Sequence, residues 1–202
     1  MSDPTAIFAA LEAHDLDRLA LALAGGGDPN ALKPTPPQWS PLHEAIEQLE
    51  DGGSIEALVL LLRHGAAVEG LEGDTPLLMA LYRDQPAAVQ VLLAAGARPD
   101  VRGVEGDTPL RTAVERGDLL TAATLLRCGA TATINDSGGA LGASALGFAA
   151  RRLDLPMIEL LLQWGADPAA LDADRMTAHA RLPSPSPENQ SAWVQADQLL
   201  RR

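Results

Sequence analysis

The sequence predicts an all-α solenoid of about six helix-turn-helix units, and three repeated features support this fold class. First, the hexapeptide Glu72–Leu77 (EGDTPL) returns unchanged as Glu105–Leu110, 33 residues later. Second, looser copies begin at Ser40 and Ser144, so the Ser/Thr of the motif occurs at positions 40, 75, 108 and 144. Third, a Leu-Leu-x-x-Gly-Ala motif follows each copy at a similar distance. A near-constant period of this length indicates a stack of identical supersecondary units.

The local chemistry of both motifs predicts where helices begin and end. Thr75 and Thr108 are suited to accept a hydrogen bond from a free backbone N–H at a helix start. The proline that follows each threonine occupies the first helical position, where a missing N–H costs nothing. Each Leu-Leu-x-x-Gly-Ala motif is an apolar helix end followed by glycine, which tolerates a left-handed stop. Each unit therefore reads as turn, short helix, turn, longer helix and glycine stop.

Together these motifs resemble the ankyrin repeat, whose signature is T-P-L-H-x-A at a period of 33 residues. The resemblance covers residues 3–202, almost the whole chain. It implies an ankyrin-repeat solenoid and a surface that binds proteins through the turn tips and the exposed end of each first helix. Only His43 keeps the family's histidine after the leucine, since Leu78, Arg111 and Gly147 stand at the equivalent positions.

We predict a single domain over residues 3–202, and its first half divides into three units. Residues 3–30 form the N-terminal capping unit, with one helix from Asp3-Pro4 to about Ala13 and a second over about Leu16 to Ala24. Residues 31–69 form the second unit, which starts with a proline-rich turn and has a lengthened turn between its helices. Residues 70–101 form the third unit.

The second half of the predicted domain also divides into three units. Residues 102–134 are regular, and residues 135–171 follow a glycine-rich loop. Residues 172–202 form a degenerate C-terminal cap, in which Thr177 occupies the marker position and Pro183–Pro187 forbids a helix. We expect a final helix, begun by Asn189 or Ser191 and ending near Arg201, to cover the exposed end of the core.

The charge balance narrows the classes of partner. The 202 residues include 15 Lys/Arg and 27 Asp/Glu, which gives a net charge of −12. Such an acidic chain should repel nucleic acid and anionic membranes. The single cysteine, Cys128, excludes an internal disulfide, and we recognise neither a secretory signal nor a membrane-spanning run. We therefore expect a monomeric cytoplasmic protein.

The sequence supports neither catalysis nor a cofactor or metal site. Its four histidines, His14, His43, His64 and His179, lie outside any metal-ligand spacing. Cys128 has no base nearby in sequence, and a phosphate-binding G-x-x-x-x-G-K-[ST] loop is missing. Distant residues can still converge in space, so an enzyme stays open as an alternative.

Positions that the fold does not require point to a binding surface. Arg83, Arg116 and Arg152 share one register in three successive units, so stacking should align them in a column able to bind carboxylates. Turn-tip carboxylates could instead neutralise this column; these are Glu72, Asp74, Glu105 and Asp107. Exposed aromatics beside arginine are typical interface anchors. The predicted partner-binding residues are Trp39, Tyr82, Arg83, Arg116, Arg151 and Arg152.

The sequence thus favours a non-catalytic protein–protein interaction module. It should bind a partner protein with an acidic segment through the concave groove and the turn tips. Two alternatives remain. One is a small-ligand or anion-binding protein, or an enzyme, that uses the same groove. The other is a structural protein that associates with itself.

Overall fold

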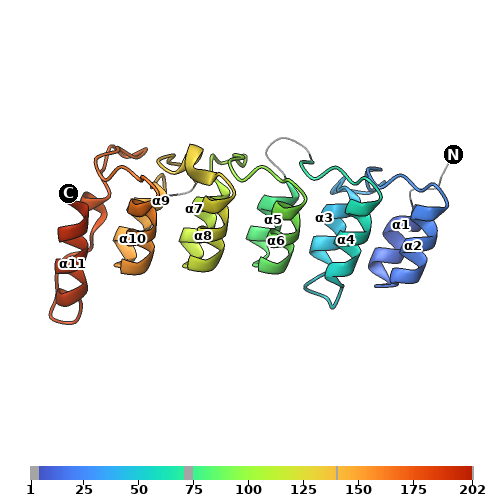
Figure 1. The fold of residues 1–202 in the computed structure, drawn as a ribbon, viewed down its shortest axis with the longest axis horizontal. Coiled ribbons are helices and arrows are strands. Elements are labelled where there is room, and N and C mark those ends of the chain that lie inside the picture. The colour runs from blue at the N-terminus through green and yellow to red at the C-terminus, as the bar shows by residue number, and fades with distance from the viewer. Residues whose placement is uncertain (1–4, 71–74, 140, 202) are drawn as a thin grey trace. The chain divides into compact units, whose positions relative to one another are not determined.

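The computed structural model describes residues 5–70, 75–139 and 141–201, and helices are the main regular structure in these ranges (Figure 1). They contain eleven α-helices, two 3₁₀ helices and one isolated antiparallel bridge between Ser137 and Ser144. The all-helical prediction is confirmed. Two compact units, Met1–Ala97 and Arg98–Arg202, divide the chain. None of the helices in the described ranges is long and apolar enough to cross a membrane.

The first unit contains three helix pairs arranged in two rows. The first helices of the pairs, α1, α3 and α5, pack against one another in sequence order, and α2, α4 and α6 form the second row. Leucine, isoleucine and alanine fill the space between the rows. The helices are α1 (Thr5–Glu12), α2 (Leu16–Ala24), α3 (Pro41–Glu47), α4 (Ile55–Arg63), α5 (Pro76–Tyr82) and α6 (Pro86–Ala94).

The second unit continues the pattern and then modifies it. The short helix η2 takes the place of a first helix beside α9, and α11 packs against α10 as a second helix would. The predicted degenerate unit with a final helix is therefore present. The elements are α7 (Pro109–Arg116), α8 (Leu119–Arg127), η1 (Ala130–Thr133), α9 (Ala145–Arg152), α10 (Leu155–Gln163), η2 (His179–Arg181) and α11 (Gln190–Leu200).

Helix starts follow the predicted capping chemistry, with one exception. The hydroxyls of Thr75 and Thr108 each accept a hydrogen bond, at 3.3 Å, from the backbone N–H three residues ahead. Ser144 does the same at 3.1 Å. Ser40 differs, because its hydroxyl lies 2.8 Å from Nδ1 of His43 and makes no capping bond to the backbone. Histidine therefore competes for the cap where the unit retains it.

Helix ends confirm the glycine stops. The four predicted stop glycines have φ values between +88° and +110°, and at three of them an added Cβ would meet nothing within 4 Å. Backbone conformation, and not crowding, therefore selects glycine at those three positions. The four are Gly65, Gly96, Gly129 and Gly165.

Two expectations about the chain ends need correction. Asn189 stands at the start of α11 but does not cap it, because its side chain accepts from the backbone N–H of Ser186 and donates to the carbonyl of Ser184. It closes the proline-rich loop instead. From its place near the cap, Trp164 would be expected to pack against the core, but it is 37% exposed, and Leu161 and Ala166 are the buried residues there. The predicted start at Asp3-Pro4 lies outside the described residues.

Candidate functional site

Arg83, in the first unit, already has carboxylate partners. Its guanidinium lies 2.7 Å from the carboxylate of Glu47 and 3.8 Å from that of Glu50. Both acids belong to the preceding repeat, at the end of α3 and in the turn that follows it. The sequence left open that turn-tip carboxylates neutralise this arginine, and the two acids found beside it come from α3 and the turn after it. The tip residues Leu71, Glu72 and Asp74 lie outside the described residues.

In the second unit, three arginines lie at the ends of adjacent first helices. Arg116 ends α7, Arg151 and Arg152 end α9, and the two helices pack side by side. Arg152 donates from Nη1 to the backbone carbonyl of Glu115 at 2.5 Å, so it satisfies a free carbonyl at the end of α7. All three side chains are exposed. The structure therefore brings this part of the predicted set together.

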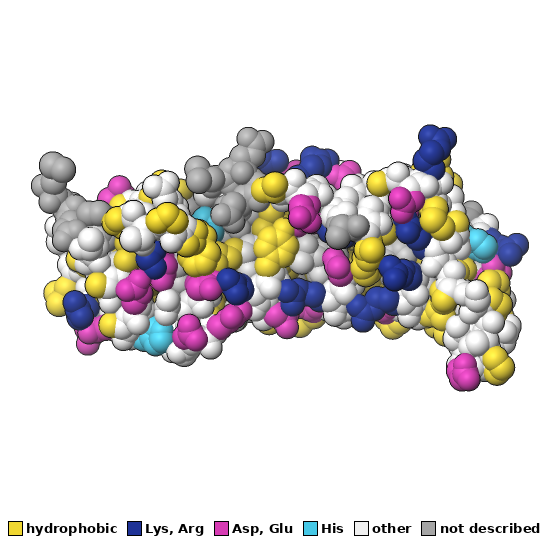
Figure 2. Space-filling view, turned by 180° about the vertical axis from the view of Figure 1, so that it is seen from behind, with side chains coloured by type: hydrophobic (Ala, Val, Ile, Leu, Met, Phe, Trp, Pro, Cys, Tyr) yellow, Lys and Arg dark blue, Asp and Glu magenta, His cyan; other side chains and the backbone are white. Residues whose placement is uncertain are grey.

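Arg151 and Arg152 differ from Arg83 in their contacts with carboxylates. Within the described ranges, neither forms a salt bridge. Arg152 contacts the backbone carbonyl of Glu115, whose carboxylate lies 3.4 Å from the buried guanidinium of Arg111. In Figure 2, several Lys or Arg side chains are visible over the part of the chain that forms the second unit. Arg151 and Arg152 therefore form an exposed cationic patch on a protein whose net charge is −12.

Charge is divided unevenly between the two halves of the sequence. Residues 1–97 carry four Lys/Arg and fourteen Asp/Glu, a net charge of −10. Residues 98–202 carry eleven Lys/Arg and thirteen Asp/Glu, a net charge of −2. Almost all of the acidity therefore belongs to the first unit, and the exposed cations belong to the second.

The two predicted aromatic residues differ in their surroundings. Tyr82, the last residue of α5, is 46% exposed. Trp39 is half-buried and forms part of the wall of a surface hollow of about 180 Å³. The hollow was not predicted, because its walls come from two loops about thirty residues apart. Its lining residues are Asn30, Leu32, Gln38, Trp39, Ser40, His43, Ala67 and Gly70.

A buried ion cluster next to this hollow serves the fold. Nζ of Lys33 lies 2.9 Å from Glu44 and 2.8 Å from Glu12, and it stands 6.0 Å above the ring of Phe8. Burial acts to lower the pKa of Lys33, but its bonds to the two carboxylates outweigh this effect and raise it. Because Glu44 is buried and also bonded by Gln48, this lysine is held inward and is not available to a partner.

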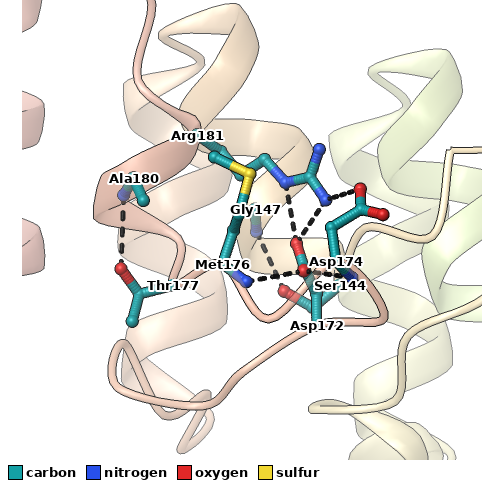
Figure 3. A network of polar contacts seen from close by, with 8 residues as sticks. All are labelled: Ser144, Gly147, Asp172, Asp174, Met176, Thr177, Ala180 and Arg181. Atoms are coloured by element: carbon teal, nitrogen blue, oxygen red, sulfur yellow. Dashed lines mark hydrogen bonds and ion pairs between the residues drawn. The ribbon is translucent and has the colours of Figure 1, made fainter.

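A second polar network fixes the C-terminal capping unit (Figure 3). Arg181 reaches Asp172 at 2.7 Å and Asp174 at 2.6 Å. The other carboxylate oxygen of Asp172 accepts the backbone N–H groups of Asp174 and Met176, each at 3.0 Å. Burial acts to raise the pKa of Asp172, but these donors lower it overall, and the pKa of Arg181 is raised. Thr177 accepts the backbone N–H of Ala180, as its marker position predicts.

The last helix is held by a further carboxylate. Asp197 of α11 lies 2.7 Å from Nε2 of His179 and 2.7 Å from Nε of Arg201. The hydrogen bonds from His179 and then Arg201 lower the pKa of Asp197. Sequence reasoning missed both C-terminal networks because they depend on side-chain contacts within the degenerate unit, which the repeat motifs do not reveal. Their role here is structural.

Groups suited to catalysis do not gather elsewhere in the described ranges. Cys128 is a free, exposed thiol at the end of α8. The described residues include no group of three or more His, Cys, Asp or Glu side chains that could hold a metal ion. In the part of the chain that the structure describes, the candidate binding features are therefore the exposed pair Arg151 and Arg152 and the hollow at Trp39.

Both the sequence and the fold of this chain are similar to those of known proteins. Residues 6–103 match the family model "Ankyrin repeats (3 copies)". No curated protein matches the sequence significantly. The ankyrin repeat domain of Bcl-3, described as a unique member of the IkappaB protein family, has a TM-score of 0.76 and 27% identity, with coverage of 97% of this chain and 81% of that one.

Two further solved structures extend the likeness. EF0377, an ankyrin repeat protein, has a TM-score of 0.77 and 20% identity over 100% of this chain and 99% of its own, which shows the fold alone. A chain from the complex of Bd0816, a predatory endopeptidase from Bdellovibrio bacteriovorus, with immunity protein Bd3460 has a TM-score of 0.70 and 28% identity, over 97% and 96% of the two chains. Motifs, family model and structure agree: residues 6–103 match the ankyrin-repeat family model, and the fold of nearly the whole chain is similar to that of solved ankyrin-repeat structures.

Proposed function

We propose that the protein is a non-catalytic interaction module, which binds a partner protein through the first-helix faces and turn tips of its repeats. One observation carries the proposal. Arg151 and Arg152 are exposed and have no salt bridge within the described ranges, on a chain with almost twice as many acidic as basic residues. Paired arginines without local carboxylates are suited to bidentate recognition of carboxylates on another molecule.

The solved relatives support an interaction role. One structure holds a complex between an endopeptidase and an immunity protein, and another relative belongs to the IkappaB protein family. Fold alone does not define function, so the residues must carry the argument. We propose that Arg116, Arg151 and Arg152 receive an acidic segment, while Trp39 and Tyr82 supply apolar contact area. Arg83 contributes less than we expected, because a partner must compete with Glu47 and Glu50 for it.

The proposal also covers the oligomeric state of the protein, its cell compartment and the partners that it does not bind. We propose a monomer that works in the cytoplasm and binds neither nucleic acid nor membranes. The support is the net charge of −12, which opposes binding to polyanions, and a single exposed cysteine, which suits a reducing compartment.

Capture of the partner from the native host, followed by affinity measurements, tests the proposal. The full chain should retain a single stoichiometric protein, identified by mass spectrometry. Against that partner, Arg151→Glu should weaken binding at least tenfold, about 1.4 kcal/mol. The matched control is Arg127→Glu, which makes the same charge change on α8, in the second-helix row. It should stay within about twofold.

Three outcomes would replace the proposal. Equal weakening by both variants would show a general charge effect. Turnover of a substrate or a tightly bound small anion, without a protein partner, would favour an enzyme or ligand-binding protein. A concentration-dependent dimer that buries the cationic patch would favour self-association.

A further inference from the structure

The hollow at Trp39 has the properties of a side-chain binding site in the first unit. Its volume of about 180 Å³ is similar to that of engineered apolar cavities, of about 150 Å³, that bind benzene. Leu32, 45% exposed, and the half-buried Trp39 supply its apolar walls. The space therefore fits one branched aliphatic or aromatic side chain.

Three of the four polar side chains that line the hollow are already hydrogen-bonded. Asn30 donates to the carbonyl of Gly65 at 3.0 Å and accepts from the N–H of Ala67 at 2.6 Å. Ser40 and His43 bond to each other at 2.8 Å. Because these groups need no further partner, an apolar side chain can enter without leaving a buried polar group unsatisfied. Gln38, at the rim, is exposed and forms no such bond within the described residues.

The surroundings of the hollow are acidic. The first half of the sequence carries a net charge of −10. Asp28 lies two residues before Asn30, and Glu69 lies between the lining residues Ala67 and Gly70. The only lysine nearby, Lys33, is bound to Glu12 and Glu44. A ligand segment with basic residues beside its apolar side chain is therefore electrostatically complementary to this unit.

We infer that this hollow binds a large apolar side chain of the partner, flanked by Lys or Arg. The inference rests on the proposed function and adds a second, oppositely charged recognition element to it. The partner then presents a basic-apolar segment to the first unit and an acidic segment to the arginines of the second.

Three blocked peptides test the site directly. The first is Gly-Lys-Ser-Leu-Ser-Lys-Gly, the second has Glu in place of both lysines, and the third has Ala in place of the leucine. Indole N–H signals in NMR spectra report on the three tryptophans, and a Trp39→Phe variant assigns the signal of Trp39. The first peptide should shift that signal and leave those of Trp164 and Trp193 unchanged. The glutamate peptide should bind at least tenfold more weakly, and the alanine peptide should cause no saturable shift.

Two matched variants separate shape from charge. Ala67→Leu fills the hollow from an exposed position and should abolish the shift, with circular dichroism confirming the fold. Gln38→Lys and Gln38→Glu change only the charge at the rim. They should weaken and strengthen binding of the lysine peptide, respectively, by about two- to fivefold. Equal binding of all three peptides, no shift at Trp39, or no change in either Gln38 variant would overturn the inference.

Failure here can be distinguished from failure of the proposed function. If the captured partner binds Ala67→Leu as tightly as the wild type but loses affinity for Arg151→Glu, the inference is wrong and the proposed function stands. If the lysine peptide binds at Trp39 but no protein partner is found, the hollow remains a site and the proposed function is wrong.

Discussion

Replacement of Arg181 by alanine should strongly destabilise the second unit. The side chain of Asp172 is 1% exposed and that of Arg181 is 14% exposed, so the substitution leaves a buried carboxylate without its cation. Removal of one partner of a buried ion pair costs about 3–5 kcal/mol. Asp172 keeps two backbone N–H donors, from Asp174 and Met176. We therefore expect the free energy of unfolding to fall by about 2–3 kcal/mol, at or just below the lower end of that range.

Urea unfolding followed by tryptophan fluorescence measures this loss. In a Trp39→Phe background, the remaining fluorophores, Trp164 and Trp193, both belong to the second unit. The control is Asp174→Ala, which removes the exposed acid of the same network, 59% exposed, and should cost only about 0–1 kcal/mol. A cost below about 0.5 kcal/mol for Arg181→Ala, or equal costs for the two variants, would refute the reasoning.

Three further changes test other parts of the structure. Gly139→Ala should destabilise the second unit more than Gly96→Ala destabilises the first, and thermal unfolding compares the two. A Cβ at Gly139 would collide with Nη2 of the buried Arg111, whereas alanine at Gly96 suffers only backbone strain, about 1–2 kcal/mol. Burial acts to raise the pKa of Asp172, but Arg181 lowers it overall, and His179 lowers the pKa of Asp197. Both carboxylates therefore stabilise the fold above about pH 4, and this stabilisation is lost as the pH falls through their folded-state pKa values. Acid titration should show a smaller loss of stability for Asp197→Asn than for the wild type. Truncation after Glu188 removes α11 and should lower the unfolding midpoint or cause association, which light scattering detects, whereas an unchanged monomer would show that α11 is not a cap.

The repeated motifs were sufficient to predict most of the fold. Helix starts at Thr75 and Thr108 and stops at the four glycines depend on local backbone chemistry, which sequence reveals directly. The degenerate unit was also predictable, since Thr177 keeps the marker position. Its internal bonds were not, because the contact between Arg181 and Asp172 depends on how far the arginine side chain reaches in the folded unit.

The candidate site was less predictable than the fold. The number of residues between each arginine and the Ser/Thr of its repeat motif was enough to place Arg116, Arg151 and Arg152 on adjacent first helices of the second unit. It could not show that Arg83 is paired with Glu47, because that contact depends on side-chain reach between repeats. Nor could it find the hollow at Trp39, whose walls come from separate loops. The alignment of Arg83 with the other arginines stays a prediction.

Hydrogen exchange of the protein with and without its captured partner tests the central claim most directly. The proposal predicts slower exchange in the turn tips and at the C-terminal ends of α7 and α9. It predicts no change in the second helices of the repeats, α4, α6, α8 and α10. Backbone amides buried by a partner exchange more slowly because local opening becomes rarer. Protection confined to α4, α6, α8 and α10, with the ends of α7 and α9 unchanged, would contradict the claim and place the binding surface on the second helices of the repeats.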